Sequence, residues 1–279
     1  PAQSNFSGVL HQLEWIDLAH ERGWDVLLDA AAFVPTSRLD LSRWKPDYVA
    51  VSFYKMFGYP TGVGALIARR EALGKLHRPW FAGGTISVAS VKADKFFLHP
   101  GAEGFEDGTI NYGCLPAVER GLDFLDGIGM ETIHARVIAL AGWLIDGLLA
   151  LRHGNGRPVV RLYGPATTDG RGGTVSINVV DRDGAVVDHT IVERAAAKRM
   201  ISLRTGCFCN PGAGELALGL TRGDIERCFN QPESRMSYDE FRLCVDPKSA
   251  GAVRISPGLV SNFADVQAVL ALMGEFRQP

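Results

Sequence analysis

The stretch "DYVAVSFYKMFGYPTGVGALIARR", residues 47–70, places one lysine between two apolar runs. The first run is continuous up to Ser52, and the second begins at residue 63. Between them Lys55 stands among aromatic residues and is followed by a turn rich in glycine and proline. Short continuous apolar runs of this kind are typical of buried strands in α/β sheets. The pattern therefore predicts two strands, the first of which ends near Lys55.

A third apolar run lies upstream in "WDVLLDAAAFVP", residues 24–35, and its strand is predicted to end at Asp29. Before it, residues 9–22 carry apolar side chains at helical spacing, with Gly23 as a C-cap. Alternating helices and short strands predict a largely parallel α/β sheet. In open sheets of this kind the chemistry lies at the carboxyl ends of the strands. Asp29, Ser52 and Lys55 all fall at such ends.

The pattern changes beyond residue 157 and predicts a smaller α+β unit. We expect the following elements: helices at 116–128 and 130–151, strands at 159–165, 173–184, 200–206 and 252–258, and helices at 187–198 and 262–276. Ser261 or Asn262 is the expected N-cap of the last helix. The glycine-rich stretch at 153–158 suggests a large domain over residues 1–153 and a small one over residues 154–279.

The composition bounds the class of protein. The 279 residues are 46% hydrophobic and 22% charged. The net charge of −2 lacks the excess of basic residues that is typical of nucleic-acid-binding proteins. We expect no membrane span, because the longest apolar helix candidate carries Glu131, Arg136 and Asp146. The five cysteines are an odd number, and no secretory signal opens the chain. These features predict a cytoplasmic protein with free or reactive thiols.

Lys55 and Asp29 permit a specific chemistry and also plain alternatives. An amine among aromatic rings can be partly desolvated, which makes it a better nucleophile toward a carbonyl. A buried carboxylate needs a cationic partner, and a protonated pyridine nitrogen is one such partner. Alternatively, Lys55 is a surface lysine at a strand end and Asp29 caps backbone amides.

The segment "RTGCFCNPG", residues 204–212, holds two cysteines, Cys207 and Cys209. Their spacing is tighter than that of zinc knuckles, and a disulfide between them would close a small, strained ring. Buried packing and a reactive thiol remain open. Glycine and proline mark a loop, and Arg204 provides a positive charge that favours a thiolate.

Six ordered segments resemble the class V aminotransferase superfamily and, within it, the aminotransferase-like domain of molybdenum cofactor sulfurases. The segments are residues 1–9, 27–37, 52–67, 105–110, 204–213 and 253–258. The resemblance spans nearly the whole chain. It implies a pyridoxal phosphate (PLP)-dependent enzyme of fold type I, with a PLP-binding domain and a smaller C-terminal domain that carries the cysteines.

The resemblance also implies roles for the cofactor ligands. Lys55 matches the lysine that forms the Schiff base with PLP, and Asp29 matches the acid at the pyridine nitrogen. Asn5 matches a residue near the phenolic oxygen, and Ser52 matches a phosphate ligand. Thr109 matches a threonine that reaches the phosphate from a second subunit, which implies a homodimer.

For the substrate, the resemblance assigns Cys209 as the catalytic thiol and Arg254 as the ligand of the substrate carboxylate. Arg204 supports the loop or the substrate, and Cys207 is a relay thiol or a bystander. The implied reaction takes sulfur from L-cysteine as a Cys209 persulfide. The implied acceptor is the molybdenum cofactor or its target enzyme, in which a sulfido ligand replaces an oxo ligand.

Two positions depart from the general desulfurase pattern. Tyr54 stands where many desulfurases have a histidine, and Ala32 stands where many have a glutamine. Relatives carry a segment before "SNFSG", so we expect the chain to lack an N-terminal part. Three other functions stay open: another class V activity (selenocysteine lyase or aminotransferase), a non-catalytic scaffold, and a metal-binding protein.

Overall fold

The computed structural model describes residues 1–230, 235–245 and 249–279 and divides the chain into two compact units. The first unit contains residues 1–2 and 12–130, and the second contains residues 3–11 and 131–279. We describe each unit by itself. The boundary expected near residue 153 falls inside the second unit, because the helix before it packs on that unit's sheet.

The first unit is built on a three-stranded sheet in the order β1 (Leu27–Asp29), β2 (Tyr48–Ser52), β3 (Gly64–Ala68). Strands β1 and β2 are parallel, whereas β3 runs antiparallel to β2. The connection over residues 53–63 is shorter than the dozen or so residues that a parallel crossover needs. Among the described strands, β1 and β2 therefore form the parallel part of the sheet.

One face of this sheet is buried. Leu28 and Val49 pack with Ile16 of α1 (Trp15–His20) in a single apolar cluster. Side chains alternate between the faces of a strand, so the neighbouring positions point to the other side. The helix expected over residues 9–22 begins only at Trp15. The prediction was wrong at its start, because Val9 forms a β-bridge with Arg171 of the second unit instead.

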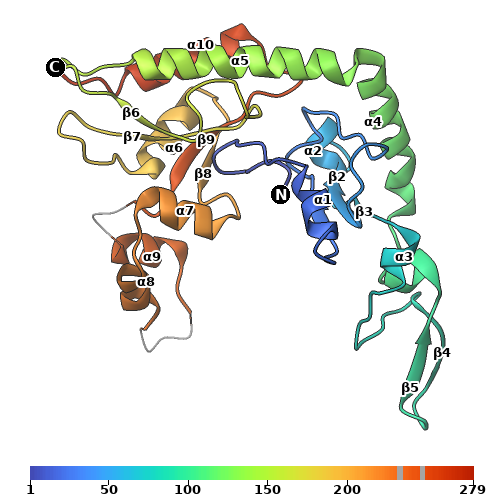
Figure 1. The fold of residues 1–279 in the computed structure, drawn as a ribbon. Coiled ribbons are helices and arrows are strands. Elements are labelled where there is room, and N and C mark those ends of the chain that lie inside the picture. The colour runs from blue at the N-terminus through green and yellow to red at the C-terminus, as the bar shows by residue number, and fades with distance from the viewer. Residues whose placement is uncertain (231–234, 246–248) are drawn as a thin grey trace. The chain divides into compact units, whose positions relative to one another are not determined.

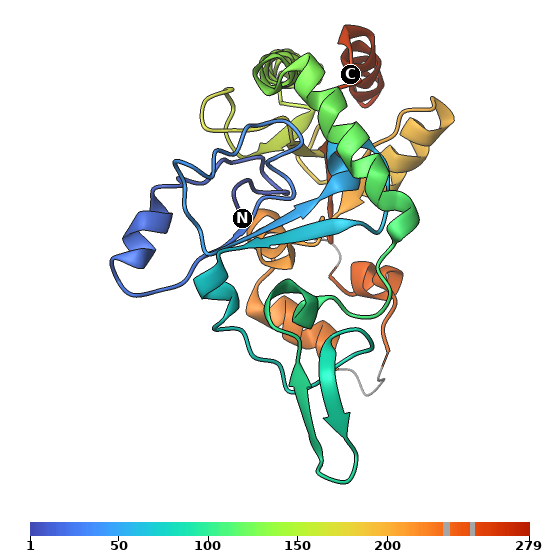
Figure 2. The same ribbon diagram turned by 90° about the vertical axis from the view of Figure 1, so that its right-hand side faces the viewer.

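The rest of the first unit consists of short elements. They are α2 (Phe53–Phe57), α3 (Arg70–Leu73), β4 (Ile86–Ser90), β5 (Lys95–Leu98), η1 (Gly101–Phe105), η2 (Tyr112–Cys114) and α4 (Leu115–Ile128). Strands β4 and β5 form an antiparallel ribbon that extends away from the β1–β2–β3 sheet in both views (Figures 1 and 2).

The second unit contains a four-stranded antiparallel sheet in the order β6-β7-β9-β8. The strands are β6 (Val160–Tyr163), β7 (Val175–Val179), β8 (Arg204–Gly206) and β9 (Ala252–Ile255), and the helices that pack on them are α5 (Met130–Ala150), α6 (His189–Lys198) and α10 (Phe263–Gly274). Figure 1 shows α10 beside α5. The side chain of Asn262 caps α10, which decides between the two expected caps.

Helix α5 is long and apolar enough to cross a membrane by length and composition, so the expectation of no such segment was too strong. One helix of this kind is weak evidence for a span, because core helices meet the same criteria. Here Leu140, Leu144 and Leu148 are buried in the main apolar cluster with strands β7 and β9. The apolar side of α5 serves the core of the second unit.

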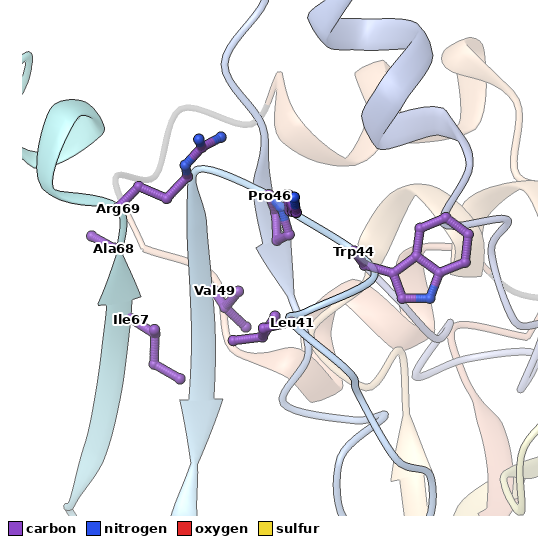
Figure 3. Close-up of a pocket in the computed structure, with 8 residues that line it drawn as sticks. Leu41, Trp44, Pro46, Val49, Ile67, Ala68 and Arg69 are labelled. Carbon is purple, nitrogen blue, oxygen red and sulfur yellow. The ribbon is translucent and has the colours of Figure 1, made fainter.

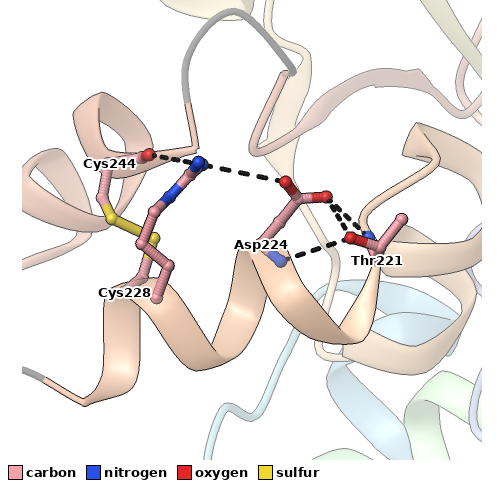
Figure 4. Close-up of a disulfide and its surroundings, with 5 residues drawn as sticks. Thr221, Asp224, Cys228 and Cys244 are labelled. Atoms are coloured by element: carbon pink, nitrogen blue, oxygen red, sulfur yellow. Dashed lines mark hydrogen bonds and ion pairs between the residues drawn. A yellow bond between two sulfur atoms is a disulfide. The ribbon is translucent and has the colours of Figure 1, made fainter.

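Three further helices complete the second unit: α7 (Pro211–Leu218), α8 (Arg222–Phe229) and α9 (Tyr238–Cys244). A disulfide joins Cys228 of α8 to Cys244 of α9 (Figure 4). The expectation that the thiols are free was therefore wrong for this pair. Packing of α8 on α9 brings the two Cα atoms to 5.8 Å, a proximity that the sequence separation alone does not reveal.

Candidate functional site

The first unit brings Asp29, Ser52 and Lys55 to one edge of its sheet, and we call this set the strand-end site. Asp29 ends β1 and is paired with Ala50 of β2, so its side chain points to the same face as those of Ala50 and Ser52. Helix α2 begins directly after Ser52 and carries Lys55 as its middle residue. Lys55 was expected at a strand end and lies in this short helix instead.

The polar groups of the strand-end site have bonding capacity left. Asp29 is exposed, and its Oδ1 accepts a hydrogen bond from the Ala31 amide at 3.0 Å. Ser52 is the N-cap residue of α2, yet its side chain makes no capping bond. The Lys55 amine is exposed and has no hydrogen-bond partner among the described residues. Within the described residues, a carboxylate with one oxygen still available, a hydroxyl that caps no helix and an unpaired primary amine thus lie at one edge.

These groups fit PLP, the cofactor that the resemblance implies. The cofactor offers an aldehyde to an amine, a basic ring nitrogen to a carboxylate and a phosphate to a hydroxyl. Lys55, Asp29 and Ser52 would hold these three groups respectively. When bound, PLP supplies an electron sink for a carbanion at the substrate Cα.

A surface hollow of about 360 Å³ in the first unit lies on the other face of the sheet. Val49 and Ile67 line it together with Leu41 and Trp44 (Figure 3). Val49 faces away from the side that carries Asp29, because adjacent strand positions point to opposite faces. The hollow is therefore separate from the strand-end site.

In the second unit the segment Cys207–Asn210, which we call the cysteine loop, connects β8 to α7. Phe208 and Cys209 both have left-handed backbones, with φ of 57° and 59°. This conformation is uncommon for residues other than glycine. Phe208 is buried, whereas Cys209 is exposed and Cys207 is half-buried. Both of these cysteines are free thiols.

Arg254 of β9 lies against the cysteine loop. Its Cζ is 4.8 Å from the centroid of the Phe208 ring, and its Nη1 donates to the Asn5 carbonyl at 3.0 Å. Burial, first, and the charge of Arg204 lower the pKa of Arg254, and Cys209 opposes that shift. The buried Nε of Arg254 has no hydrogen-bond partner among the described residues. A buried donor without an acceptor is costly, so this nitrogen suits an anionic ligand.

Asn5 belongs to the second unit and holds the cysteine loop through both ends of its amide. Its Nδ2 donates to the Phe208 carbonyl at 2.6 Å, and its Oδ1 accepts from Asn210 Nδ2 at 3.1 Å. The contact between Asn5 and the phenolic oxygen of the cofactor stays a prediction. The structure shows instead that Asn5, in the segment "SNFSG", is hydrogen-bonded to the cysteine loop.

The remaining predicted residues have the following places. Arg204 is exposed on β8 directly opposite Arg254 in the antiparallel pair, which places the two arginines side by side on the strands next to the cysteine loop. Thr109 is exposed in the first unit, shortly after Asp107, which pairs with Arg78. Its role toward a second subunit stays a prediction. The second unit thus brings together Asn5, Arg204, Cys209 and Arg254.

The sequence profile of the family described as Aminotransferase class-V matches residues 2–269. The chain belongs to the class-V aminotransferase family. This class-V chain is 38% identical to the molybdenum cofactor sulfurase of Homo sapiens over 293 residues, which cover 99% of the chain and 32% of that protein. The corresponding protein of Bos taurus is 39% identical over 286 residues, with 97% and 32% covered. The chain spans about a third of the length of these relatives.

Solved structures place the class-V chain in the expected fold, that of the PLP-dependent enzymes of fold type I. The cysteine desulfurase of Thermococcus onnurineus NA1, solved in the apo form, superposes with a TM-score of 0.72 at 24% identity. The match covers 98% of this chain and 58% of that one. The cysteine desulfurase CsdA of Escherichia coli gives 0.71 at 19% identity, with 99% and 57% covered. Family and neighbours together support PLP as the cofactor.

The residue that the sequence reasoning missed is Phe208. It was treated only as the spacer between two cysteines, yet its ring contacts Arg254 and its carbonyl contacts Asn5. An aromatic side chain inside a loop otherwise marked by glycine and proline is the signal that could have found it. Its partners are more than 40 residues away along the chain, so the sequence alone does not name them.

Proposed function

We propose that this chain is the PLP-dependent part of a cysteine desulfurase-type sulfurtransferase, which takes sulfur from L-cysteine as a persulfide on Cys209. One observation carries the proposal: the buried Nε of Arg254 has no hydrogen-bond partner among the described residues, and this arginine packs on the ring next to the exposed thiol of Cys209. That arrangement suits a small substrate that carries both a carboxylate and a sulfur atom. The strand-end site supports the cofactor half of the proposal.

The residues of the second unit act on the substrate carboxylate and sulfur. Arg254 binds the α-carboxylate, since a guanidinium matches the two oxygens of a carboxylate better than an ammonium does. The hydrogen bond to the Asn5 carbonyl and the Phe208 ring orient that guanidinium before substrate arrives. Arg204, opposite Arg254 in the sheet, adds a second positive charge, which favours an anionic substrate.

The residues of the first unit move the proton and hold the charge. The free amine of Lys55 takes the Cα proton of L-cysteine, and Asp29 keeps the ring nitrogen of the cofactor protonated. The Cys209 thiolate then forms an S–S bond with the substrate sulfur while the C–S bond breaks. The electron pair of that bond stays on Cβ, which takes a proton, and the Lys55 ammonium returns its proton to Cα, so that alanine leaves. The transferred sulfur remains on Cys209 as a persulfide.

We further propose that the sulfur is passed to the molybdenum cofactor or to its target enzyme. The support is the similarity to the two molybdenum cofactor sulfurases over nearly all of this chain. We also propose a homodimer in which Thr109 reaches the cofactor phosphate of the partner, and a cytoplasmic location. Light scattering of the purified protein tests the dimer, and a monomeric mass would count against it.

The function is tested by mass spectrometry of the protein after incubation with PLP and L-cysteine. We expect one additional sulfur on Cys209 and release of alanine. Cys209→Ala should lose the added sulfur and retain the absorbance of the PLP imine, whereas Cys114→Ala should behave as the unmodified protein. Unchanged sulfur release by Cys209→Ala would reject the assignment, and amino transfer to a keto acid by that variant would favour an aminotransferase.

A further inference from the structure

We propose that Phe208 is a positioning residue, which sets the guanidinium of Arg254 and the thiol of Cys209 in one arrangement. The inference deepens the proposed function and rests on it for its catalytic consequence. Its structural basis is independent of any cofactor, because every contact involved lies within the second unit.

The ring of Phe208 is fixed on two sides. It is 4% exposed, and its centroid lies 5.4 Å from that of Phe6 in a cluster that also contains Tyr163 and Ala252. The guanidinium of Arg254 covers the ring at 4.8 Å. A cation over an aromatic face is attracted by the ring quadrupole, and the attraction grows when the pair is desolvated. The ring therefore fixes Arg254 as well as itself.

The backbone of Phe208 is fixed by a different contact. Its carbonyl accepts the amide of Asn5 at 2.6 Å, and the same Asn5 accepts from Asn210 at the other end of the loop. The left-handed backbone conformations of Phe208 and Cys209 lie between these two hydrogen bonds of Asn5. Sparsely populated conformations persist where the surroundings over-determine them, and they cluster at functional sites.

The consequence is that the two cysteines on either side of Phe208 become unequal. Cys207 is half-buried, and its Cβ lies 3.3 Å from the point where Gly214 of α7 would place a Cβ atom. Cys209 is exposed and directly follows Phe208, whose ring carries the guanidinium of Arg254. One anchored residue thus separates a thiol that packs against a helix from an exposed thiol next to the ring that carries Arg254.

The experiment compares the unmodified protein with Phe208→Leu and Phe208→Tyr, and uses Phe276→Leu as the control for a lost aromatic ring elsewhere in the unit. Iodoacetamide is added without L-cysteine, and mass spectrometry gives the rate of modification of Cys209 relative to Cys207. The kcat and KM for L-cysteine are measured on the same preparations. We expect Phe208→Leu to lower the modification ratio and to raise KM, each by about tenfold, because the cation–π contact and the anchor are lost. Phe208→Tyr keeps the ring and should stay near the unmodified protein.

An unchanged ratio and KM in Phe208→Leu would overturn the proposal, as would equal changes in Phe276→Leu. If Phe208→Leu does not fold, Asn5→Ala decides the question, because it frees the Phe208 carbonyl without opening a cavity around the ring. That variant should lower the modification ratio in the same direction, and an unchanged ratio would contradict the proposal. The alkylation readout needs no desulfurase activity, so failure of the proposed function and failure of this inference are distinguishable.

Discussion

In the first unit the predicted functional residues contribute little to the fold, whereas in the second unit they are part of it. Asp29 is exposed at the end of β1 and Lys55 is exposed in the short helix that follows β2, where its amine has no partner among the described residues. Asn5 and Arg254 instead link segments that are 249 residues apart in sequence. The residues predicted to be functional are therefore held in place in two different ways within one chain.

This difference indicates where a mutation should change activity without changing the stability of the fold. Side chains at strand ends are placed by the backbone, so their polar groups can be changed at little cost to the fold. Side chains that link distant segments contribute both to the proposed chemistry and to the stability of the fold. Their replacement leaves buried partners unsatisfied, which costs more than the contact itself contributes.

The largest expected effect tests the first half of the comparison. Lys55→Ala should lower alanine formation from L-cysteine by roughly 10²- to 10⁴-fold, since it removes the group that moves the Cα proton. The midpoint of thermal unfolding of the protein without added PLP should not change, because Lys55 is exposed and unpaired among the described residues. Lys45→Ala, at the hollow on the other face of the sheet, is the matched control. A lower unfolding midpoint in Lys55→Ala would break the comparison.

The disulfide between α8 and α9 is a cross-link within the second unit that has no role in the proposed chemistry. Cys228→Ser should lower the free energy of unfolding by about 3 kcal/mol, since the disulfide closes a loop in the unfolded chain. Urea unfolding without a reductant measures the loss. Persulfide formation on Cys209 should continue at the unmodified rate, and its disappearance would mean that the helix pair and the cysteine loop are coupled.

Arg254→Gln tests the second half of the comparison. We expect KM for L-cysteine to rise about ten- to a hundredfold, because a hydrogen-bonded charged group is lost. Unlike Lys55→Ala, it should also lower the free energy of unfolding by about 1 kcal/mol through loss of the contact with the Phe208 ring. Arg182→Gln, at an exposed position shortly after β7 in the same unit, should change neither quantity. A normal stability in Arg254→Gln would show that the arginine serves the substrate alone.

The smallest effect concerns pH. Burial lowers the pKa of His189, whereas the unfolded chain keeps a value of about 6.5. The unfolded state therefore binds more protons as the pH falls through 6.5, and stability must decrease toward acid pH. Nearby, burial raises the pKa of Tyr238 to about 12, so its phenol stays neutral in this range. Urea titrations at about pH 7 and about pH 5.5 give the decrease in the free energy of unfolding between these two pH values. This decrease should be smaller for His189→Gln than for His77→Gln, the control at an exposed histidine. An equal loss in both variants would remove His189 as the cause.

Much of this fold could be predicted from local patterns. The strands that contain Asp29 and Ser52 and the long apolar helix α5 all lie where their periodicity or apolar runs indicated. The start of α1 was misplaced, because helical spacing at residues 9–14 competes with a β-bridge to Arg171 that the sequence does not reveal. The pairing of Cys228 with Cys244 was missed for the same reason: it depends on how two helices pack.

By itself, the sequence determined the family, the fold class and the residue types available for chemistry, because these depend on ordered motifs and on hydrophobic patterns along the chain. Only the tertiary structure decided that Asn5 brackets the cysteine loop, that Phe208 carries the guanidinium of Arg254, and that Cys209 rather than Cys207 is exposed. The physical reason is the separation along the sequence between the residues that make each contact. A local pattern encodes which face of an element is buried, whereas a contact between residues 5 and 208 exists only once both segments have folded onto the same sheet.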